Sequence, residues 1–279
     1  MSLSDYRKVL VTGASSGIGE AVVRRLTSHN LEVHALARRH DRLSDLAAAT
    51  GCIPLALDLR DTDAIYETLQ STEYDVLINN AGLGRGYNSL AAASREDIDR
   101  TIETNVTAAI HVVHALLPGM ISRQRGHLVN LGSIAGLYPM PTALYGASKG
   151  ALHLLSQGLR MELKGSGVRC TEICPARVRT EFFDTAFDDP AKAAQAAVGF
   201  QLLEPDDIAD AIMYALDAPW RVTLALLRSP QPNSISAAST SNPSGSSIRR
   251  ASVQHTSVPL RNAKRLHRLC GLRHTYPIS

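Results

Sequence analysis

Cysteine is scarce in the sequence, and its spacing excludes two classes of protein. The chain has 279 residues and four cysteines, with no CxxC pair and no histidines at the spacing of a zinc site. A disulfide framework and a structural zinc site are therefore not expected. We predict reduced thiols, no bound metal and a cytoplasmic protein.

Long apolar runs and aromatic residues are also scarce. The chain enters a strand-like run at residues 8–11 with no hydrophobic leader before it, and no later run is long enough to cross a bilayer. We therefore expect neither a signal peptide nor a membrane span. Aromatic residues make up 5% of the chain, whereas alanine, leucine and valine are plentiful, which favours helices packed on a sheet. The length allows a large core.

Acidic residues stop at Asp217. Residues 221–279 hold nine Lys or Arg and no Asp or Glu, so the net charge of +3 conceals a net charge of −6 in residues 1–220. The acid-free end is first Ser-rich, with eight serines in residues 229–248, and then basic with scattered prolines. Such a composition buries too little apolar surface to offset the entropy of ordering.

We therefore predict two regions, a folded domain in residues 1–228 and a low-complexity tail in residues 229–279. The tail could be a basic arm that binds nucleic acid or an anionic membrane, or a solvated extension without a folded role. The abrupt change in composition favours the extension, so neither nucleic-acid binding nor membrane binding is expected. Deleting the tail should then leave the activity of the domain unchanged.

Strand-like and helix-like segments alternate along the first part of the chain, which favours βαβ units. The predicted fold class is α/β, with a single Rossmann-like, doubly wound parallel sheet in a three-layer αβα arrangement. The predicted strands are residues 8–12, 32–37, 53–58, 75–79, 126–131 and 168–173. The predicted helices are residues 17–28, 41–49, 61–70, 95–117, 143–164 and 205–216.

A glycine-rich turn connects the first strand to the first helix. It contains Gly13, Gly17 and Gly19. Glycines allow a tight turn, a close approach of the backbone to a phosphate, and close packing of helix on strand. The following helix presents unpaired N–H groups and the positive end of its dipole. An ordinary glycine-rich loop is the alternative, but the strand–turn–helix context favours binding of a dinucleotide.

The end of the second strand indicates which dinucleotide is bound. An acid there would accept from the ribose 2′-hydroxyl of NAD, whereas an arginine accommodates the 2′-phosphate of NADP. The sequence has Arg38 and Arg39, with no acid before Asp41. We predict NADP rather than NAD, with Arg38 as the first candidate for the phosphate and Arg39 as the second. The alternative is that both arginines only solvate a loop.

Two further strand ends lie at the same predicted edge of the sheet. Asp58 closes the third strand and could accept from the adenine amino group. The fourth strand ends at Asn79-Asn80-Ala81-Gly82, where small residues would let the backbone approach a flat ring. These signals carry weight only together with the glycine turn.

Tyr145 and Lys149 are four residues apart near the start of a predicted helix, so they share one face. An ammonium near the phenol would lower the tyrosine pKa from about 10 and suit it to acid–base chemistry. Ser133 lies just past the fifth strand and could converge with Tyr145 over one crevice. Asn105 lies within the helical pattern of residues 95–117, where it could face solvent, bend the helix or hold a water. A solvated helix face is the ordinary explanation of such a pair.

The ordered motifs resemble the short-chain dehydrogenase/reductase family over roughly residues 8–220. They are Thr12-Gly13-x-x-x-Gly17-x-Gly19, Asn79-Asn80-Ala81-Gly82, Asn105, Ser133, Tyr145-x-x-x-Lys149 and Pro175-x-x-Val178-x-Thr180. The resemblance implies hydride transfer between NADP(H) and a small-molecule carbonyl or secondary alcohol. It makes Tyr145 the general acid/base and Lys149 the residue that lowers its pKa and binds the ribose. Ser133 would bind the substrate oxygen, and Asn105 would hold a water in a proton relay.

The resemblance also assigns the cofactor-binding positions. They are Gly13, Ser15, Ser16, Gly17, Ile18, Gly19, Arg38, Arg39, Asp58, Leu59, Asn80, Ala81, Gly82, Tyr145, Lys149, Pro175, Val178 and Thr180. One departure is Ala176, where the family has glycine. The family also implies a homodimer or homotetramer built through helices 95–117 and 143–164. A nucleotide-sugar epimerase lacks support from the glycine spacing, and a non-catalytic NADP-binding sensor need not keep Tyr145 and Lys149.

The substrate is the least determined feature of the sequence. Residues 204–222 look similar to the branch of the family that acts on 3-hydroxy acids. Arg177 and Arg179 could then bind a carboxylate, or both could face solvent on a loop. The phenylalanines of the segment after Pro175 keep a lipid, steroid or polyketide carbonyl open.

Overall fold

The computed structural model describes residues 3–87, 89–187, 189–195, 198 and 201–229. These residues belong to one compact unit. The low-complexity tail predicted for residues 229–279 lies outside the described residues, apart from Ser229.

Seven parallel strands form one sheet, in the order β3-β2-β1-β4-β5-β6-β7. The order reverses at β1, where β2 and β3 extend to one side and β4 to β7 to the other. The predicted doubly wound parallel sheet is therefore confirmed. The strands are β1 Lys8–Thr12, β2 Glu32–Ala37, β3 Ile53–Ala56, β4 Val76–Asn79, β5 Gly126–Leu131, β6 Val168–Pro175 and β7 Leu226–Ser229.

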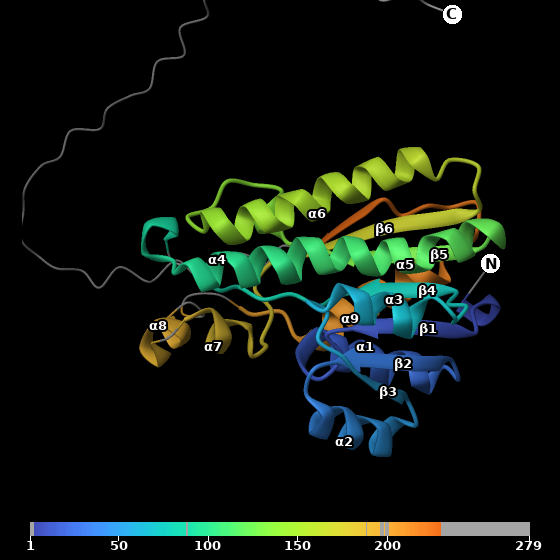
Figure 1. Cartoon of the computed structure of the whole chain (residues 1–279), viewed down its shortest axis with the longest axis horizontal. Coiled ribbons are helices and arrows are strands. Elements are labelled where there is room, and N and C mark those ends of the chain that lie inside the picture. Colours follow the sequence, from blue (N-terminus) through green and yellow to red (C-terminus); the bar gives the residue numbers. More distant parts are fainter. Residues whose placement is uncertain (1–2, 88, 188, 196–197, 199–200, 230–279) are drawn as a thin grey trace, which may run out of the picture. The chain divides into compact units, whose positions relative to one another are not determined.

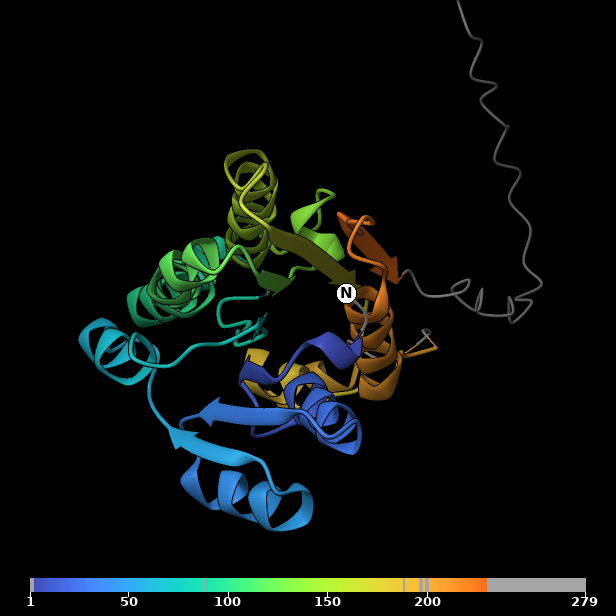
Figure 2. The same cartoon turned by 90° about the vertical axis from the view of Figure 1, so that its right-hand side faces the viewer.

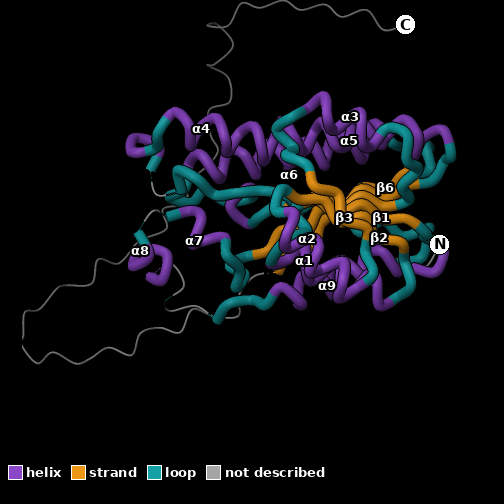
Figure 3. The backbone as a smooth tube through the Cα atoms, turned by 60° about the horizontal axis from the view of Figure 1, so that its bottom comes forward, coloured by secondary structure: helices purple, strands orange, loops and turns teal. Residues whose placement is uncertain are grey.

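Helices cover both faces of the sheet, as Figures 1 and 2 show. Helices α1, α2 and α9 pack on one face with Leu26, Leu43 and Ile212 fully buried, and α3, α5 and α6 pack on the other with Ile65 and Met120. In Figure 3 the strands lie between these two helical layers. The helices are α1 Gly17–Ser28, α2 His40–Thr50, α3 Thr62–Leu69, α4 Arg95–Ile102, α5 Ala109–Ser122, α6 Ala143–Glu162, α7 Phe182–Ala186, α8 Pro190–Gln195 and α9 Pro205–Asp217.

Short helical turns complete the connections between these elements. They are η1 Leu3–Asp5, η2 Leu90–Ala92, the π-helical turn η3 Glu103–Ala108 and η4 Ile134–Gly136. Helices α7 and α8 lie at the same end of the sheet as α4 (Figure 1). That end carries the carboxyl ends of the strands and the segments that cover them.

The long helix predicted for residues 95–117 is interrupted and extended. Helix α4 passes through η3 into α5, which continues past Pro118 to Ser122. The predicted stop before Pro118 is wrong because Leu116 and Met120, on either side of the proline, are buried in the core. Their burial offsets the hydrogen bond that a proline removes from a helix.

The same helical segment corrects the expectation that the chain has no run long enough to span a bilayer. Arg95–Ser122 has the length of a span, and its most apolar window has a mean hydropathy of 1.3. Of that window, 44% is buried inside the protein. Helix α5 packs on the sheet through Val112, Val113 and Leu116. A core helix of this kind can be as long and as apolar as a membrane span.

Candidate active site

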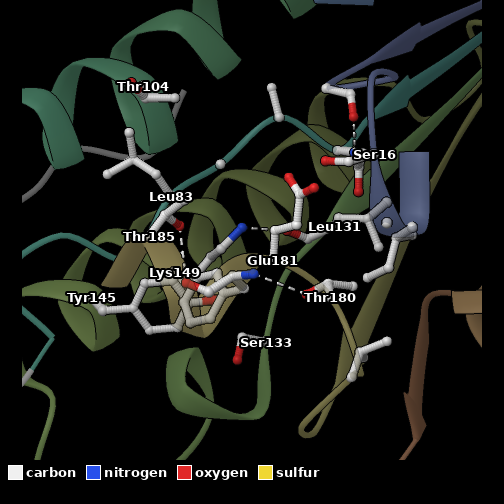
Figure 4. Close-up of a pocket in the computed structure, with 18 of the residues that line it drawn as sticks. Ser16, Leu83, Thr104, Leu131, Ser133, Tyr145, Lys149, Thr180, Glu181 and Thr185 are labelled. Atoms are coloured by element: carbon white, nitrogen blue, oxygen red, sulfur yellow. Dashed lines mark hydrogen bonds between the residues drawn. The ribbon is translucent and has the colours of Figure 1, made fainter. Parts of the chain in front are cut away.

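One cavity of about 680 Å³ opens at the carboxyl ends of the central strands. Every catalytic or cofactor-binding residue predicted from the sequence lines it except Gly19 and Asn105. Its walls come from the glycine turn, the ends of β2, β4, β5 and β6, the start of α6, and a lid segment that we define as residues 177–187. In Figure 4 the side chains of Ser133, Tyr145 and Lys149 lie together, and Ser16 lies apart from them.

The glycine turn is tied closely to the end of β4. Gly13 has a φ of +66°, and a Cβ there would lie 2.9 Å from the Ala81 Cα. The Asn80 Nδ2 donates to the Thr12 carbonyl oxygen at 2.9 Å, and the Asn80 N–H donates to the Thr12 hydroxyl at 3.0 Å. A Cβ on Gly19 would collide with the Gly13 carbonyl oxygen. Gly19 therefore packs α1 against the turn and does not line the cavity.

Arg39 connects this turn to the lid. Its Nε donates to the Ser15 hydroxyl at 3.0 Å, its Nη2 donates to the Ser16 hydroxyl at 2.6 Å, and its Nη1 lies 2.9 Å from Glu181 Oε2. Arg42 pairs with the other oxygen of Glu181. Hydrogen bonds from both arginines lower the pKa of Glu181. Arg38 also lines the cavity.

Asp58 lines the cavity from the loop after β3, but its carboxylate is already bound. The Arg60 Nη2 donates to Asp58 Oδ2 at 2.7 Å, and the Arg60 backbone N–H donates to Oδ1 at 3.0 Å. The hydrogen bond from the Arg60 side chain is the main cause of the lowered pKa of Asp58. Any contact with an adenine would therefore share this carboxylate with Arg60.

Tyr145 and Lys149 occupy the first two turns of α6 and are buried, with 9% and 5% of their surface exposed. The Lys149 Nζ donates to the Leu131 carbonyl oxygen at 2.7 Å. Burial lowers the Lys149 pKa to about 8. Burial also raises the Tyr145 pKa, an effect that a hydrogen bond with Ser133 opposes. The expected lowering of the tyrosine pKa is therefore wrong for this structure.

The lid explains why the pKa of Tyr145 is raised and not lowered. The Phe182 ring lies 5.2 Å from the Tyr145 ring and the Tyr87 ring lies 5.6 Å from it, measured between centroids. Phe183 and Phe187 pack on Tyr87 from the same segment. These rings exclude water from the phenol, and desolvation disfavours its charged form.

Asn105 lies behind the cavity, on the π-helical turn η3. Its Oδ1 accepts from the Leu83 N–H at 2.8 Å, and its Nδ2 donates to the Leu83 carbonyl oxygen at 2.8 Å and to the Ser148 hydroxyl at 3.0 Å. A Cβ on Gly82 would lie 3.2 Å from Asn105 Oδ1 and 3.4 Å from Lys149 Nζ. Both side chains thus lie close to Gly82. Of the three roles considered for Asn105, the structure shows the distorted helix.

The two arginines considered for a substrate carboxylate lie in different places. Arg177 lines the cavity, whereas the Arg179 Nε donates to Glu204 Oε1 at 2.8 Å. The Arg179 side chain is 65% exposed and does not line the cavity. Of these two arginines, Arg177 alone lines the cavity.

The sequence did not indicate several residues of this cavity. Tyr87 comes from the loop after β4 and Glu181 from the lid, and neither belongs to the motifs quoted above. The position of Tyr87, just past Asn79-Asn80-Ala81-Gly82, was the available signal for it. The other lining residues without a prediction include Arg85, Arg100, Thr104 and Met140.

Two histidines of α5 bind a tyrosine. His111 Nδ1 and His114 Nδ1 lie 2.8 Å and 3.1 Å from the Tyr66 hydroxyl. Within the described part of the chain, no group of three or more His, Cys, Asp or Glu side chains could hold a metal ion.

Comparisons with known proteins agree with this geometry. The family model described as short chain dehydrogenase matches residues 7–191. The NADP-dependent 3-hydroxy acid dehydrogenase YdfG of Salmonella typhi is 39% identical over 226 residues, which cover 77% of this chain and 91% of that protein. The closed form of a serine dehydrogenase complexed with NADP+ is 35% identical with a TM-score of 0.77, covering 88% of this chain and 100% of that chain. A short-chain dehydrogenase of Sphingobium yanoikuyae in complex with NADPH is 32% identical with a TM-score of 0.70, covering 80% and 87%.

Proposed function

The chain belongs to the short-chain dehydrogenase/reductase family, and we propose that it is an oxidoreductase that moves a hydride between NADP(H) and the carbonyl or secondary alcohol of a small hydroxy acid. The observation that carries this proposal is a cavity that joins the glycine turn to Ser133, Tyr145 and Lys149. A reactive centre and a dinucleotide site in one cavity are what such a transfer requires.

The glycine turn fits a dinucleotide. Gly13 and Gly17 have positive φ values and line the cavity, so the backbone there is bare of side chains. Ser16 precedes α1 without capping it by its side chain, which leaves the first-turn N–H groups of the helix for a phosphate. When bound, the nicotinamide cofactor supplies or accepts the hydride.

The residues of the chain handle the proton. In reduction the Tyr145 phenol donates its proton to the substrate oxygen, and Ser133 donates a hydrogen bond that stabilises the developing charge. The Lys149 ammonium stabilises the phenolate that this transfer leaves behind. Asn105, which like Lys149 lies close to Gly82, would hold the water that returns a proton. In oxidation the same steps run in reverse.

The preference for NADP rests on the arginines next to the glycine turn. Arg38 and Arg39 line the cavity, and Arg39 is held by Ser15 and Ser16. No acid of β2 or of the turn after it lines the cavity at this point. Two relatives are described with NADP in their names or bound to them.

The hydroxy-acid substrate rests on Arg177 and on the relatives. Arg177 lies in the cavity, where a guanidinium can bind a carboxylate through two hydrogen bonds. One relative is named a 3-hydroxy acid dehydrogenase and one a serine dehydrogenase. The aromatic lid keeps an apolar carbonyl substrate as the second candidate.

An assembly of two or four copies and a cytoplasmic location are parts of the same proposal. Helices α5 and α6 expose apolar side chains in the single chain, including Ile110, Ile121, Leu154 and Met161. A face of this kind is typical of an interface. Cys52, Cys170 and Cys174 are buried free thiols, which suits a reducing compartment.

A panel of carbonyl and alcohol substrates, followed by the absorbance of the reduced cofactor with NADPH and with NADH, tests the proposal. We expect reduction of short 3-oxo acids with NADPH and oxidation of short 3-hydroxy acids with NADP+. Cofactor binding without turnover of any substrate would instead favour a non-catalytic NADP-binding sensor. Equal or better efficiency with NADH would contradict the cofactor assignment.

A further inference from the structure

Glu172 is a fully buried carboxylate that the proposed reaction does not use. It lies on β6, with none of its surface exposed. A carboxylate removed from water in this way needs hydrogen bonds and compensating charge to remain ionised. The contacts of Glu172 therefore indicate the role of its charge.

One oxygen of Glu172 is held from the surface side of α6. Glu172 Oε2 lies 2.7 Å from His153 Nδ1, and His153 Nε2 lies 2.7 Å from the Gln157 side-chain amide. An ionised carboxylate can only accept hydrogen bonds, so His153 Nδ1 carries the proton between them. The His153 side chain is 18% exposed and connects the buried carboxylate to the outside.

The other oxygen faces the backbone of the active site. Glu172 Oε1 accepts from the Cys174 thiol at 3.3 Å. A Cβ on Gly132 would collide with this oxygen and would lie 2.7 Å from the Cys174 Sγ. The carboxylate thus packs directly against Gly132. On either side of Gly132 in the chain are Leu131, whose carbonyl oxygen accepts from Lys149, and Ser133.

The Cys174 thiol beside Glu172 is neutral. Burial raises the pKa of the Cys174 thiol, and the charge of Glu172 raises it further, so the thiol stays protonated and neutral. The other titratable side chains next to Glu172 are His153 from α6 and Cys170 from β6, and Arg160 of α6 acts on Cys170. Burial lowers the pKa of Lys149, and Cys174 and then Glu172 oppose that effect.

We propose that Glu172 is a positioning residue whose buried negative charge, anchored by His153 and pressed against Gly132, keeps Lys149 in its ammonium form and directed at the Leu131 carbonyl. The inference rests on the proposed function in one respect, which is the role of Lys149 in the proposed reaction. Its consequence is that the ammonium next to Tyr145 persists to a higher pH than burial alone would allow.

The charge state of Lys149 can be measured directly in the full chain by NMR. The chain has only five lysines, so labelling lysine with 13C at Cε gives few signals, and Lys149→Met identifies the one that matters. Glu172→Gln keeps the size of the side chain and removes its charge. We expect the titration midpoint of Lys149 to fall by about one pH unit in this variant. An unchanged midpoint would overturn the proposal.

Two further variants separate charge from packing. In Glu162→Gln an exposed carboxylate of the same helix as Lys149 is neutralised, and the midpoint should not move. If Glu172→Gln does not fold, the apolar pair Glu172→Met with His153→Leu replaces it, because such a swap of a buried polar pair is often tolerated. The same fall in midpoint is expected, and its absence would also overturn the proposal.

The measurement needs neither substrate nor turnover. A shifted Lys149 midpoint in a protein that reduces no carbonyl would support the role of Glu172 and contradict the proposed function. In an active enzyme, loss of turnover at every pH without a shifted midpoint would show that Glu172 only packs. The midpoint of Lys149 could shift, and the loss of NADPH binding at alkaline pH could move to lower pH with it. This combined result would support both the role of Glu172 and the proposed function.

Discussion

Arg39 and Glu181 form an ion pair of 2.9 Å that connects the glycine turn to the lid. The pair joins residues 142 positions apart in the sequence. Glu181 also binds Arg42, so two guanidinium groups converge on one carboxylate. A ribose 2′-phosphate would be recognised by the same kind of group. We therefore expect the carboxylate of the lid and the phosphate of NADP to compete for Arg39.

Removal of the competing charge should strengthen NADPH binding. In Glu181→Gln, Arg39 and Arg42 lose a carboxylate and are left for the phosphate. Both partners of the pair are about two-fifths exposed, so solvent limits the gain to about fivefold or less in the dissociation constant. Fluorescence titration with NADPH measures this gain. NADH affinity should not change, nor should NADPH affinity in Glu204→Gln, which removes the partner of Arg179. Weaker NADPH binding in Glu181→Gln would contradict the competition.

Arg39→Ala should reduce the affinity for NADPH by about tenfold to a hundredfold, because a charge-assisted hydrogen bond is lost. NADH has no 2′-phosphate, and its affinity should change little. The sequence alone ranks Arg38 first, whereas the contacts of Arg39 with Ser15 and Ser16 place its guanidinium beside the turn. Arg38→Ala is the matched comparison. If NADPH affinity fell in Arg38→Ala and not in Arg39→Ala, Arg38 would again be the first candidate for the phosphate.

Tyr145→Phe should lower kcat by about a hundredfold to ten-thousandfold, because the substitution removes the oxygen that donates or accepts the proton. The ring is buried against Phe182 and Tyr87, and phenylalanine fills the same space. NADPH affinity should therefore stay close to that of the wild type. Initial rates and a cofactor titration on the same preparation check both statements. Turnover near the wild-type rate would contradict the assigned role of Tyr145.

The sequence predicts the parts of this molecule that depend on local pattern. Gly13 and Gly17 lie in the turn where the motif predicts them, and strands β1, β2 and β5 have the predicted bounds. Such features follow from the permissiveness of glycine and from apolar runs, both of which are visible in a few neighbouring residues.

Features that depend on distant contacts could not be predicted in this way. The direction of the Tyr145 pKa shift is set by Tyr87 and Phe182, which reach it from other segments of the chain. The pairing of Arg179 with Glu204 decides which arginine stays out of the cavity. Helix α5 crosses Pro118 because of what the helix buries. In each case tertiary packing overrides the local signal.

Leu154→Arg should convert the assembly to a smaller species. Leu154 is 67% exposed on α6, where an interface through α5 and α6 would bury it. A charge there would lose its hydration in the assembly, which destabilises the interface. Tyr214 on α9 is 68% exposed on the other face of the sheet, so Tyr214→Arg is the matched control. Light scattering on both variants gives the mass of the assembly. An equal loss of mass in both would contradict the assignment of the interface to α6.

His127 lies in a buried polar cluster at the opposite ends of the strands from the cavity. Its Nε2 lies 2.9 Å from the Thr171 hydroxyl, and its Nδ1 lies 3.1 Å from the Tyr6 hydroxyl and 3.2 Å from the Arg169 guanidinium. Burial, together with the charge of Arg169, lowers the pKa of His127 to about 3. The folded protein therefore keeps this imidazole neutral throughout the mildly acidic range.

The free energy of unfolding should consequently fall as the pH decreases below the ordinary histidine pKa of about 6.5. In that range the unfolded chain binds a proton at His127 that the folded chain does not bind until about pH 3. The contribution is complete above pH 6.5 and is lost on acidification at up to about 1.4 kcal/mol per pH unit. His127→Gln keeps an acceptor for Arg169 and has no proton to bind. Urea unfolding between about pH 4 and 7 should therefore show a shallower slope in this variant, and an unchanged slope would contradict a neutral buried His127.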